Sequence, residues 1–277
     1  SLVYAGYIGG NNRDQGTGIA VSADGYAYVT GFAESSQPSF PVLVGPDLTH
    51  NGNDDAFVAK VNLDGTGLVY SGYIGGSQDD SGEGIALDSD GNAYITGFTS
   101  SYQTNGFPVL VGPDVTFNGS FDAFVAKVKA DGTGLLYSGY IGGGGTGSNG
   151  VDEGWGIAVD SDGFAYVTGI TSSTETTFPV AVGPDLTYNG GPSTMAWDAF
   201  VAKVAVDGSS LVYCGYIGGA QQDYGTDIAV DANVTPLGYA YVTGYTNSTE
   251  TTFPVAVGPD LTYNGGTWDG FVSKVKV

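Results

Sequence analysis

The sequence predicts an all-β fold, a four-bladed β-propeller with four antiparallel strands in each blade. The pentapeptide Gly-Tyr-Ile-Gly-Gly occurs four times, beginning at positions 6, 72, 139 and 215. The first copy completes the unit that the C-terminus leaves unfinished, which makes the repeat circular. A long and circular period is typical of repeats arranged around an axis.

The composition also favours strands over helices. Glycine supplies 48 of the 277 residues, and tyrosine supplies 19, whereas lysine and arginine together supply 7. Such a balance is typical of strands and tight turns. Because the repeats cover nearly the whole chain without a linker, we expect one domain spanning residues 1–277.

The second unit illustrates the strands that each repeat contains. Residues 84–88 form a short apolar run, residues 89–92 a turn, and residues 93–97 the antiparallel partner of the first run. After a long loop, residues 122–128 and 135–141 form a second hairpin around an Asp-Gly turn. Apolar side chains on both faces of the inner strands suit sheets that pack on other sheets, as propeller blades do.

The order of the strands predicts how the ring closes. Counted outward from the axis, the Gly-Ile-Ala run is the inner strand and the Tyr-x-Gly-Tyr-Ile run the outer strand. The chain thus begins with an outer strand and ends with a third strand, so residues 1–10 are expected to pair with the last strand and cover its edge. The expected blades span residues 16–76, 82–143, 154–219, and 225–277 together with 1–10.

The motifs follow one order in every unit. Tyr-x-Gly-Tyr-Ile-Gly-Gly precedes Gly-Ile-Ala-Val-Asp, Ala-Tyr-Val-Thr-Gly, Phe-Pro-Val and Asp-Ala-Phe-Val-Ala-Lys-Val, with small variations. Over all four units this pattern resembles the bacterial and archaeal SBBP (beta-propeller) repeat. The resemblance implies a propeller in an exported or cell-surface protein, usually without a defined activity. The family's name supposes seven blades, so two arrangements stay open: a four-bladed ring, or a piece that pairs with another chain to make a larger ring.

Charge narrows the range of partners. The formal net charge is −22, although only 13% of the residues are charged. Nucleic acid is an unsuitable partner because phosphate binding needs a basic face, whereas cations are natural counter-ions. No apolar run reaches transmembrane length, so we expect no membrane insertion. Low lysine content with abundant Gly, Ser, Thr, Tyr and Asp predicts an extracellular or cell-surface location.

An aspartate recurs just before each inner strand, close to the predicted axis. Four converging carboxylates would repel one another and raise each other's pKa values unless a cation lies among them. Oxygen ligands suit Ca²⁺, which is the only cofactor we expect. The alternative is that each aspartate caps its own loop through local amides. The candidate metal ligands are Asp14, Asp80, Asp152 and Asp223.

A lysine recurs in each third strand, five residues after an aspartate. The odd separation puts the two side chains on opposite faces of the strand, so any pairing would bridge neighbouring blades. A structural ring of salt bridges is therefore predicted. Its members are Asp55 and Lys60, Asp122 and Lys127, Asp198 and Lys203, and Asp269 and Lys274.

Three tryptophans lie in or beside the loops on the face with the long connections. Together with two loop tyrosines they are candidates for stacking on sugar rings, although aromatic plugs between blades are the commoner use of such residues. The candidate ligand-binding residues are Trp155, Trp197, Trp268, Tyr188 and Tyr263.

The sequence contains no recognisable catalytic constellation. His50 is the single histidine, Cys214 the single cysteine, and the acidic residues are spread evenly over the repeats. We therefore expect a non-enzymatic extracellular structural or adhesive module, which could assemble with copies of itself into a surface layer or filament through its flat faces. The alternative is a protein that binds surface glycans, or less readily cleaves them, with the long-loop face.

Overall fold

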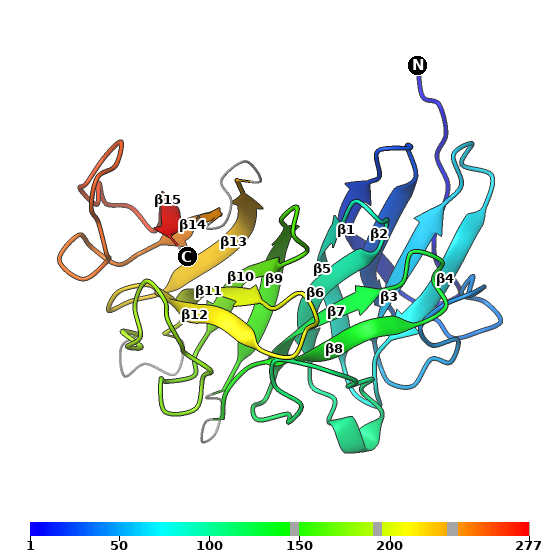
Figure 1. Cartoon of the computed structure of the whole chain (residues 1–277), viewed down its shortest axis with the longest axis horizontal. Coiled ribbons are helices and arrows are strands. Elements are labelled where there is room, and N and C mark those ends of the chain that lie inside the picture. Colours follow the sequence, from blue (N-terminus) through cyan, green and yellow to red (C-terminus); the bar gives the residue numbers. More distant parts are fainter. Residues whose placement is uncertain (145–149, 191–195, 232–237, 277) are drawn as a thin grey trace.

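The computed structural model describes residues 1–144, 150–190, 196–231 and 238–276. Apart from one 3₁₀ turn, η1 (Gln103–Asn105), the regular elements in these ranges are β-strands. They form four antiparallel sheets in which consecutive strands are neighbours (Figure 1). These sheets are blades 1 to 4 in chain order, so the predicted four-bladed propeller architecture is confirmed. No helix in the described ranges is long and apolar enough to cross a membrane.

The first three blades contain four strands and the last contains three. Blade 1 consists of β1 (Asp14–Val21), β2 (Ala27–Ala33), β3 (Asp55–Val61) and β4 (Leu68–Ile74). Blade 2 consists of β5 (Asp80–Leu87), β6 (Ala93–Thr99), β7 (Asp122–Val128) and β8 (Leu135–Ile141). Blade 3 consists of β9 (Asp152–Val159), β10 (Ala165–Thr171), β11 (Asp198–Val204) and β12 (Leu211–Ile217). Blade 4 consists of β13 (Asp223–Val230), β14 (Tyr239–Thr246) and β15 (Asp269–Lys276).

The hydrophobic core is divided among the interfaces between blades. One buried cluster contains Tyr28, Val58 and Ile74 of blade 1 together with Ile95 and Phe124 of blade 2. Equivalent clusters join blade 2 to blade 3 and blade 3 to blade 4. Because both faces of the inner blades are covered, every residue of β7 and β11 is buried, which explains their continuous apolar runs.

The long loop of each complete blade runs along the free edge of its outer strand. In blade 1 the amide of Leu43 donates to Ser71 O at 3.0 Å, and the amide of Ser71 donates to Val44 O at 2.8 Å. The two backbones approach so closely that a Cβ on Gly72 would stand 2.5 Å from the Cα of Gly45. The outer strand therefore lies between the third strand and this loop, and the first glycine of the Gly-Tyr-Ile-Gly-Gly motif permits that contact.

The blades form an arc that is open between blade 4 and blade 1. β5 packs between β1 and β9, and β9 packs between β5 and β13, so the inner strands form one row. β1 and β13 do not pack together in this way; they stand at the two ends of the row (Figure 1). One face of blade 4 is consequently uncovered, and Val275 is the only residue of β15 that is buried.

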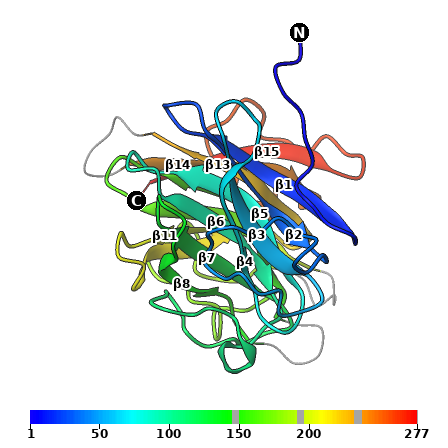
Figure 2. The ribbon, with the colours of Figure 1, turned by 90° about the vertical axis from the view of Figure 1, so that its right-hand side faces the viewer.

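The predicted pairing of residues 1–10 with the last strand is not formed in this structure. These residues contain no strand, and β15 pairs with β14 alone. They contact blade 1 instead: the Tyr4 ring lies against Gly65, and the Gly10 amide donates to Asp14 Oδ2 at 2.6 Å. The chain's first residues project away from that blade (Figures 1 and 2). Because blade 1 and blade 4 stand at opposite ends of the arc, these contacts keep residues 1–10 away from β15.

Candidate functional site

The inner-strand aspartates begin β1, β5, β9 and β13, and each one caps the connection into its own blade. Oδ2 of Asp80 accepts hydrogen bonds from the Gly76 amide at 2.7 Å and the Ser101 hydroxyl at 3.0 Å, while its Oδ1 accepts one from Thr99. The equivalent donors surround Asp152 and Asp223, and Asp14 accepts from Gly10 and Ser35.

The predicted gathering of these four aspartates into one metal site is not found. In the part of the chain that the structure describes, no three His, Cys, Asp or Glu side chains come together as a group suited to a metal ion. The physical reason is that the loop donors of each blade hold each carboxylate locally. The geometry thus favours the loop-cap interpretation of Asp14, Asp80, Asp152 and Asp223.

A second aspartate of each blade faces these caps across the blade junction. Asp55, Asp122 and Asp198, which begin the third strands, are fully buried. In each, Oδ2 accepts a loop amide hydrogen bond, whereas Oδ1 accepts no hydrogen bond of ordinary geometry. A Cβ on Gly75 would stand 2.7 Å from Asp55 Oδ1 and 2.9 Å from Asp80 Oδ2, so two carboxylates converge beside that glycine.

Burial in pairs perturbs the acidity of these carboxylates. Burial raises the pKa of Asp55 to about 7 and the pKa values of Asp122 and Asp198 to about 8, and the facing Asp152 and Asp223 raise the latter two further. Burial also raises the pKa of Asp80 to about 7, although three donors favour its charged form. Burial therefore favours the protonated form of these carboxylates near neutral pH.

Sequence reasoning missed these pairs because it assigned the third-strand aspartates to lysines. In the structure Lys127 Nζ lies 3.2 Å from Asp88 and Lys203 Nζ 3.8 Å from Asp160, each pair joining a third strand to the first turn of the same blade. Lys60 and Lys274 lie over tyrosine rings instead. The predicted inter-blade ring through Asp55, Asp122, Asp198 and Asp269 is therefore corrected: the lysines stabilise single blades, and Asp269 accepts the Asn264 amide.

The three tryptophans converge on Tyr224 of β13. The centroid of the Tyr224 ring lies 5.8 Å from that of Trp155, 5.5 Å from that of Trp197 and 5.3 Å from that of Trp268. Tyr245 of β14 also stacks on Tyr224, with the ring centroids 4.5 Å apart. This aromatic cluster joins blades 3 and 4, and its most open member, Trp268, is 37% exposed.

The two loop tyrosines have other neighbours. Tyr188 packs against Tyr216 and donates its hydroxyl to Ala196 O, while the Tyr263 hydroxyl donates to Gly266 O at 3.0 Å. The predicted sugar-binding set is thus divided: the tryptophans form one cluster, whereas Tyr188 and Tyr263 serve their own loops.

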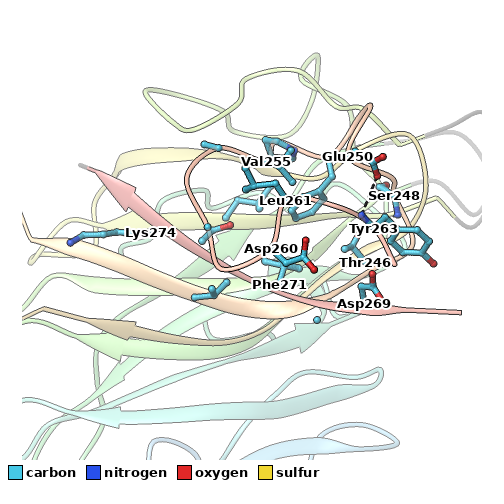
Figure 3. Close-up of a pocket in the computed structure, with 18 of the residues that line it drawn as sticks. Thr246, Ser248, Glu250, Val255, Asp260, Leu261, Tyr263, Asp269, Phe271 and Lys274 are labelled. Carbon is cyan, nitrogen blue, oxygen red and sulfur yellow. Dashed lines mark hydrogen bonds between the residues drawn. The ribbon is translucent and has the colours of Figure 1, made fainter. Parts of the chain in front are cut away.

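A groove of about 960 Å³ runs along the outer edge of blade 4. The loop of residues 253–264 forms one side and β15 forms the other, and we call it the blade 4 groove. Val255 and Leu261 line it from the loop side, and Phe271 and Lys274 from the strand side (Figure 3).

The isolated histidine and cysteine occupy structural positions. His50 Nε2 lies 3.0 Å from Ala33 O, and its ring packs against Tyr73. Cys214 is buried in β12, and burial raises the pKa of its thiol. Neither residue is held next to a catalytic partner in the contacts of the described ranges.

Comparison with known proteins identifies the repeat. The family model of the SBBP "Beta-propeller repeat" matches residues 69–103, which run from β4 through β5 and β6 to η1. The matched unit therefore joins the outer strand of one blade to the first two strands of the next. No curated protein matches the chain. With the same strand order in successive blades, the chain is a four-bladed β-propeller, and residues 69–103 of it are similar to the SBBP beta-propeller repeat.

Proposed function

We propose that the protein is a non-enzymatic structural or adhesive module of the cell surface or extracellular space, able to assemble with copies of itself. The observation that carries this proposal is the use of the repeated polar side chains. The inner-strand aspartates cap loops, the third-strand aspartates meet them at blade junctions, and Lys127 and Lys203 pair within blades. The charged side chains that recur in the repeats therefore serve to hold the loops and strands of the blades in place.

Cell fractionation tests the location that this function requires. An antibody against the protein should detect it in the surface and secreted fractions of its native cells. Detection in the cytosolic fraction alone would contradict the proposal. A panel of glycoside, ester and peptide substrates provides the second arm, in which turnover above that of a heat-denatured sample would contradict the non-enzymatic assignment.

We propose Ca²⁺ as the stabilising cation, with the net charge of −22 as the support. A cation that binds the folded state alone raises the melting temperature by mass action. Thermal unfolding in excess Ca²⁺ and in excess chelator therefore tests the proposal. A higher Tm in Ca²⁺ than in Mg²⁺ at equal concentration supports it, and equal values in Ca²⁺ and chelator would leave the inner-strand aspartates as loop caps only.

Glycan binding is the second candidate, and the aromatic cluster around Tyr224 favours it. Trp268 presents part of its ring to solvent beside Tyr245, an arrangement suited to stacking on a sugar. A glycan array with the parent and with Trp268→Ala tests this candidate. Loss of the signal in Trp268→Ala but not in Tyr102→Ala, a change of another exposed aromatic, would support it. The absence of binding by the parent would remove it.

A further inference from the structure

The blade 4 groove has the geometry of an unfilled strand position. In blade 1 the outer strand β4 pairs with β3 on one side and with the loop around Val44 on the other. Blade 4 has both neighbours of such a strand, since β15 corresponds to β3 and residues 253–260 correspond to residues 40–47. Among the described residues no strand lies between them, and the groove takes its place.

The surfaces of blade 4 that would meet an outer strand and a following blade are open. Val58 of β3 is fully buried against blade 2, whereas its counterpart Val272 of β15, which no blade follows, is 61% exposed. A Cβ on Gly45 would stand 2.4 Å from Gly72 of the outer strand, whereas one on the equivalent Gly258 would meet only atoms of its own loop. Blade 4 thus retains the surfaces that contact an outer strand without the strand itself.

The N-terminal segment, Leu2–Ile8, has the sequence that this position requires. It reads Leu-Val-Tyr-Ala-Gly-Tyr-Ile, and β4 reads Leu-Val-Tyr-Ser-Gly-Tyr-Ile. In blade 1, Tyr73 packs against Phe40 at a centroid distance of 5.1 Å and is fully buried. The equivalent of Tyr73 is Tyr7, which is fully exposed, and the equivalent of Phe40 is Phe253, which lines the blade 4 groove.

The N-terminal segment contacts blade 1 in the same way that the outer strand of blade 1 contacts blade 2. Tyr4 lies against Gly65 of blade 1 as Tyr70 lies against Gly132 of blade 2. Its own blade 4 stands at the far end of the arc (Figure 1), so the complementary groove within reach belongs to another molecule. The inner strand β1 also presents Ile19, 69% exposed, where Ile85 of β5 is buried against the preceding blade.

We propose that the blade 4 groove binds the N-terminal segment of a second copy of this chain by strand addition. The segment completes blade 4 as its fourth strand, and the copies join head to tail. Blade 1 of the second copy then covers the open face of blade 4, and its Asp14 meets Asp269 as Asp80 meets Asp55. This proposal rests on the self-assembly part of the proposed function and names its partner and its contact.

The register of the contact follows from blade 1, and disulfide trapping tests it. Ala59 of β3 pairs with Ser71 of β4, so Ser273 of β15 should pair with Ala5 of the second copy. The native thiol is first removed by Cys214→Ser, because serine is the residue at the equivalent positions 71 and 138. Two cysteine variants are then made in this background. Mixing Ala5→Cys protein with Ser273→Cys protein should give a cross-linked dimer after mild oxidation, whereas Ser1→Cys in place of Ala5→Cys should give far less.

A glycine substitution tests the same contact without touching the monomer. Gly6 has no atom within 4 Å of an added Cβ, whereas the equivalent Gly72 has backbone at 2.5 Å. For the parent, light scattering should show a mass that rises with concentration. Gly6→Val should leave the monomer's melting temperature unchanged and abolish that rise. Ser1→Val, the matched control, should retain it.

Three outcomes would overturn the proposal. A parent that stays monomeric at all concentrations would do so, as would equal assembly of the parent and Gly6→Val. The third is a cross-link that forms only within one chain of the Ala5→Cys, Ser273→Cys double variant, which would mean closure of a four-bladed ring. A monomeric parent would also remove the self-assembly part of the proposed function. None of these results changes the expected cell-surface location or lack of turnover, which fractionation and the substrate panel test separately.

Discussion

Gly169 in the middle of β10 occupies a strand position that has no room for a side chain. A Cβ at this position would stand 1.8 Å from the carbonyl oxygen of Glu153, next to the register shift between β9 and β10. The same contact recurs at Gly31, Gly97 and Gly244. Each blade therefore requires a glycine in its second strand because the bulge of the inner strand crosses it.

We expect Gly169→Ala to lower the free energy of unfolding by about 3 kcal/mol, because the methyl group has to displace backbone. Urea unfolding measures the change. Gly67→Ala is the matched control, since a Cβ there would meet only the Asn62 side chain at 3.4 Å, and it should change stability by less than about 0.5 kcal/mol. Equal losses in the two variants would contradict this explanation.

The paired aspartates predict how stability depends on pH. The folded-state pKa values of Asp55, Asp122 and Asp198 are raised to about 7 or 8 from an ordinary value of 3.8. A raised pKa means that the folded state holds the proton more tightly, so the stabilisation is complete below about pH 4 and is lost as the pH rises through 7 and 8. With chelator present to remove bound cations, we expect Tm to decrease as the pH is raised from about 5 to about 8.5.

The isosteric variant Asp122→Asn separates this effect from general titration. Removing one ionisable member of a pair should raise Tm relative to the parent at the alkaline end of the range and flatten the pH profile. Asp64→Asn, in an exposed turn where hydrogen bonds from Thr66 lower the aspartate pKa, is the control and should keep the parent's profile. A parent Tm that rises across this range would contradict the assignment.

At the scale of the element, the third strands of blades 2 and 3 are each joined to the first turn of the same blade by a lysine. Lys127 of β7 reaches Asp88, which also accepts the amides of Asp90 and Asn92 and so shapes the turn between β5 and β6. The Lys127 amine also lies 4.6 Å from the centroid of the Tyr94 ring. One side chain therefore joins a strand, a turn and an aromatic neighbour.

Lys127→Ala should lower the free energy of unfolding by about 2 to 3 kcal/mol, since it leaves the largely buried Asp88 without its cation. The equivalent Lys60→Ala in blade 1 provides the control. Lys60 lies over the rings of Tyr26 and Tyr28, and no ion pair joins it to any residue that the structure describes, so the expected loss is about 1 kcal/mol. Chemical unfolding of both variants measures the difference, and a larger loss for Lys60→Ala would contradict it.

At the scale of the whole molecule, the two interior blades are covered on both faces, whereas blades 1 and 4 at the ends of the arc each have an uncovered face. The outer edge of β15 has no strand partner, whereas β7 and β11 lie between two strands. Edges of this kind are usually paired, covered or charged in native proteins. Here Lys274 and Lys276 supply charge on β15, and the proposed second copy supplies the covering strand.

Hydrogen exchange of the intact protein should report this difference. At low protein concentration, the outward-facing amides of β15 should exchange much faster than the amides of β7 and β11. At high concentration they should become protected as copies join, and in Gly6→Val they should stay fast. Protection of β15 that is the same at every concentration and in both proteins would contradict the head-to-tail contact.

Local sequence was sufficient to place most strands. The expected third and outer strands at residues 122–128 and 135–141 coincide with β7 and β8, and the expected second strand at 93–97 lies within β6. Alternation, turn glycines and β-branched residues act over a few neighbouring positions, so they can be read directly. The inner strand is longer than expected because β5 already begins at Asp80, before the apolar run.

The candidate sites depended on contacts between blades, which local patterns do not contain. Asp55 and Asp80 belong to different blades, and the three tryptophans meet only because Tyr224 of β13 stands among them. A signal was present, because two glycines follow each outer strand. The first of them leaves room for the carboxylates at the blade junction, and the second leaves room for the long loop.

The sequence by itself determined the repeat, the order of strands within a blade and the third strand that ends the chain, because these follow from periodicity and short-range propensity. Only the tertiary structure decided whether the two ends meet. The packing of one blade on the next sets how far the arc turns, and this rotation depends on side chains from both blades acting together. With blades 1 and 4 apart, the first Gly-Tyr-Ile-Gly-Gly copy lies on blade 1 and leaves the blade 4 groove open.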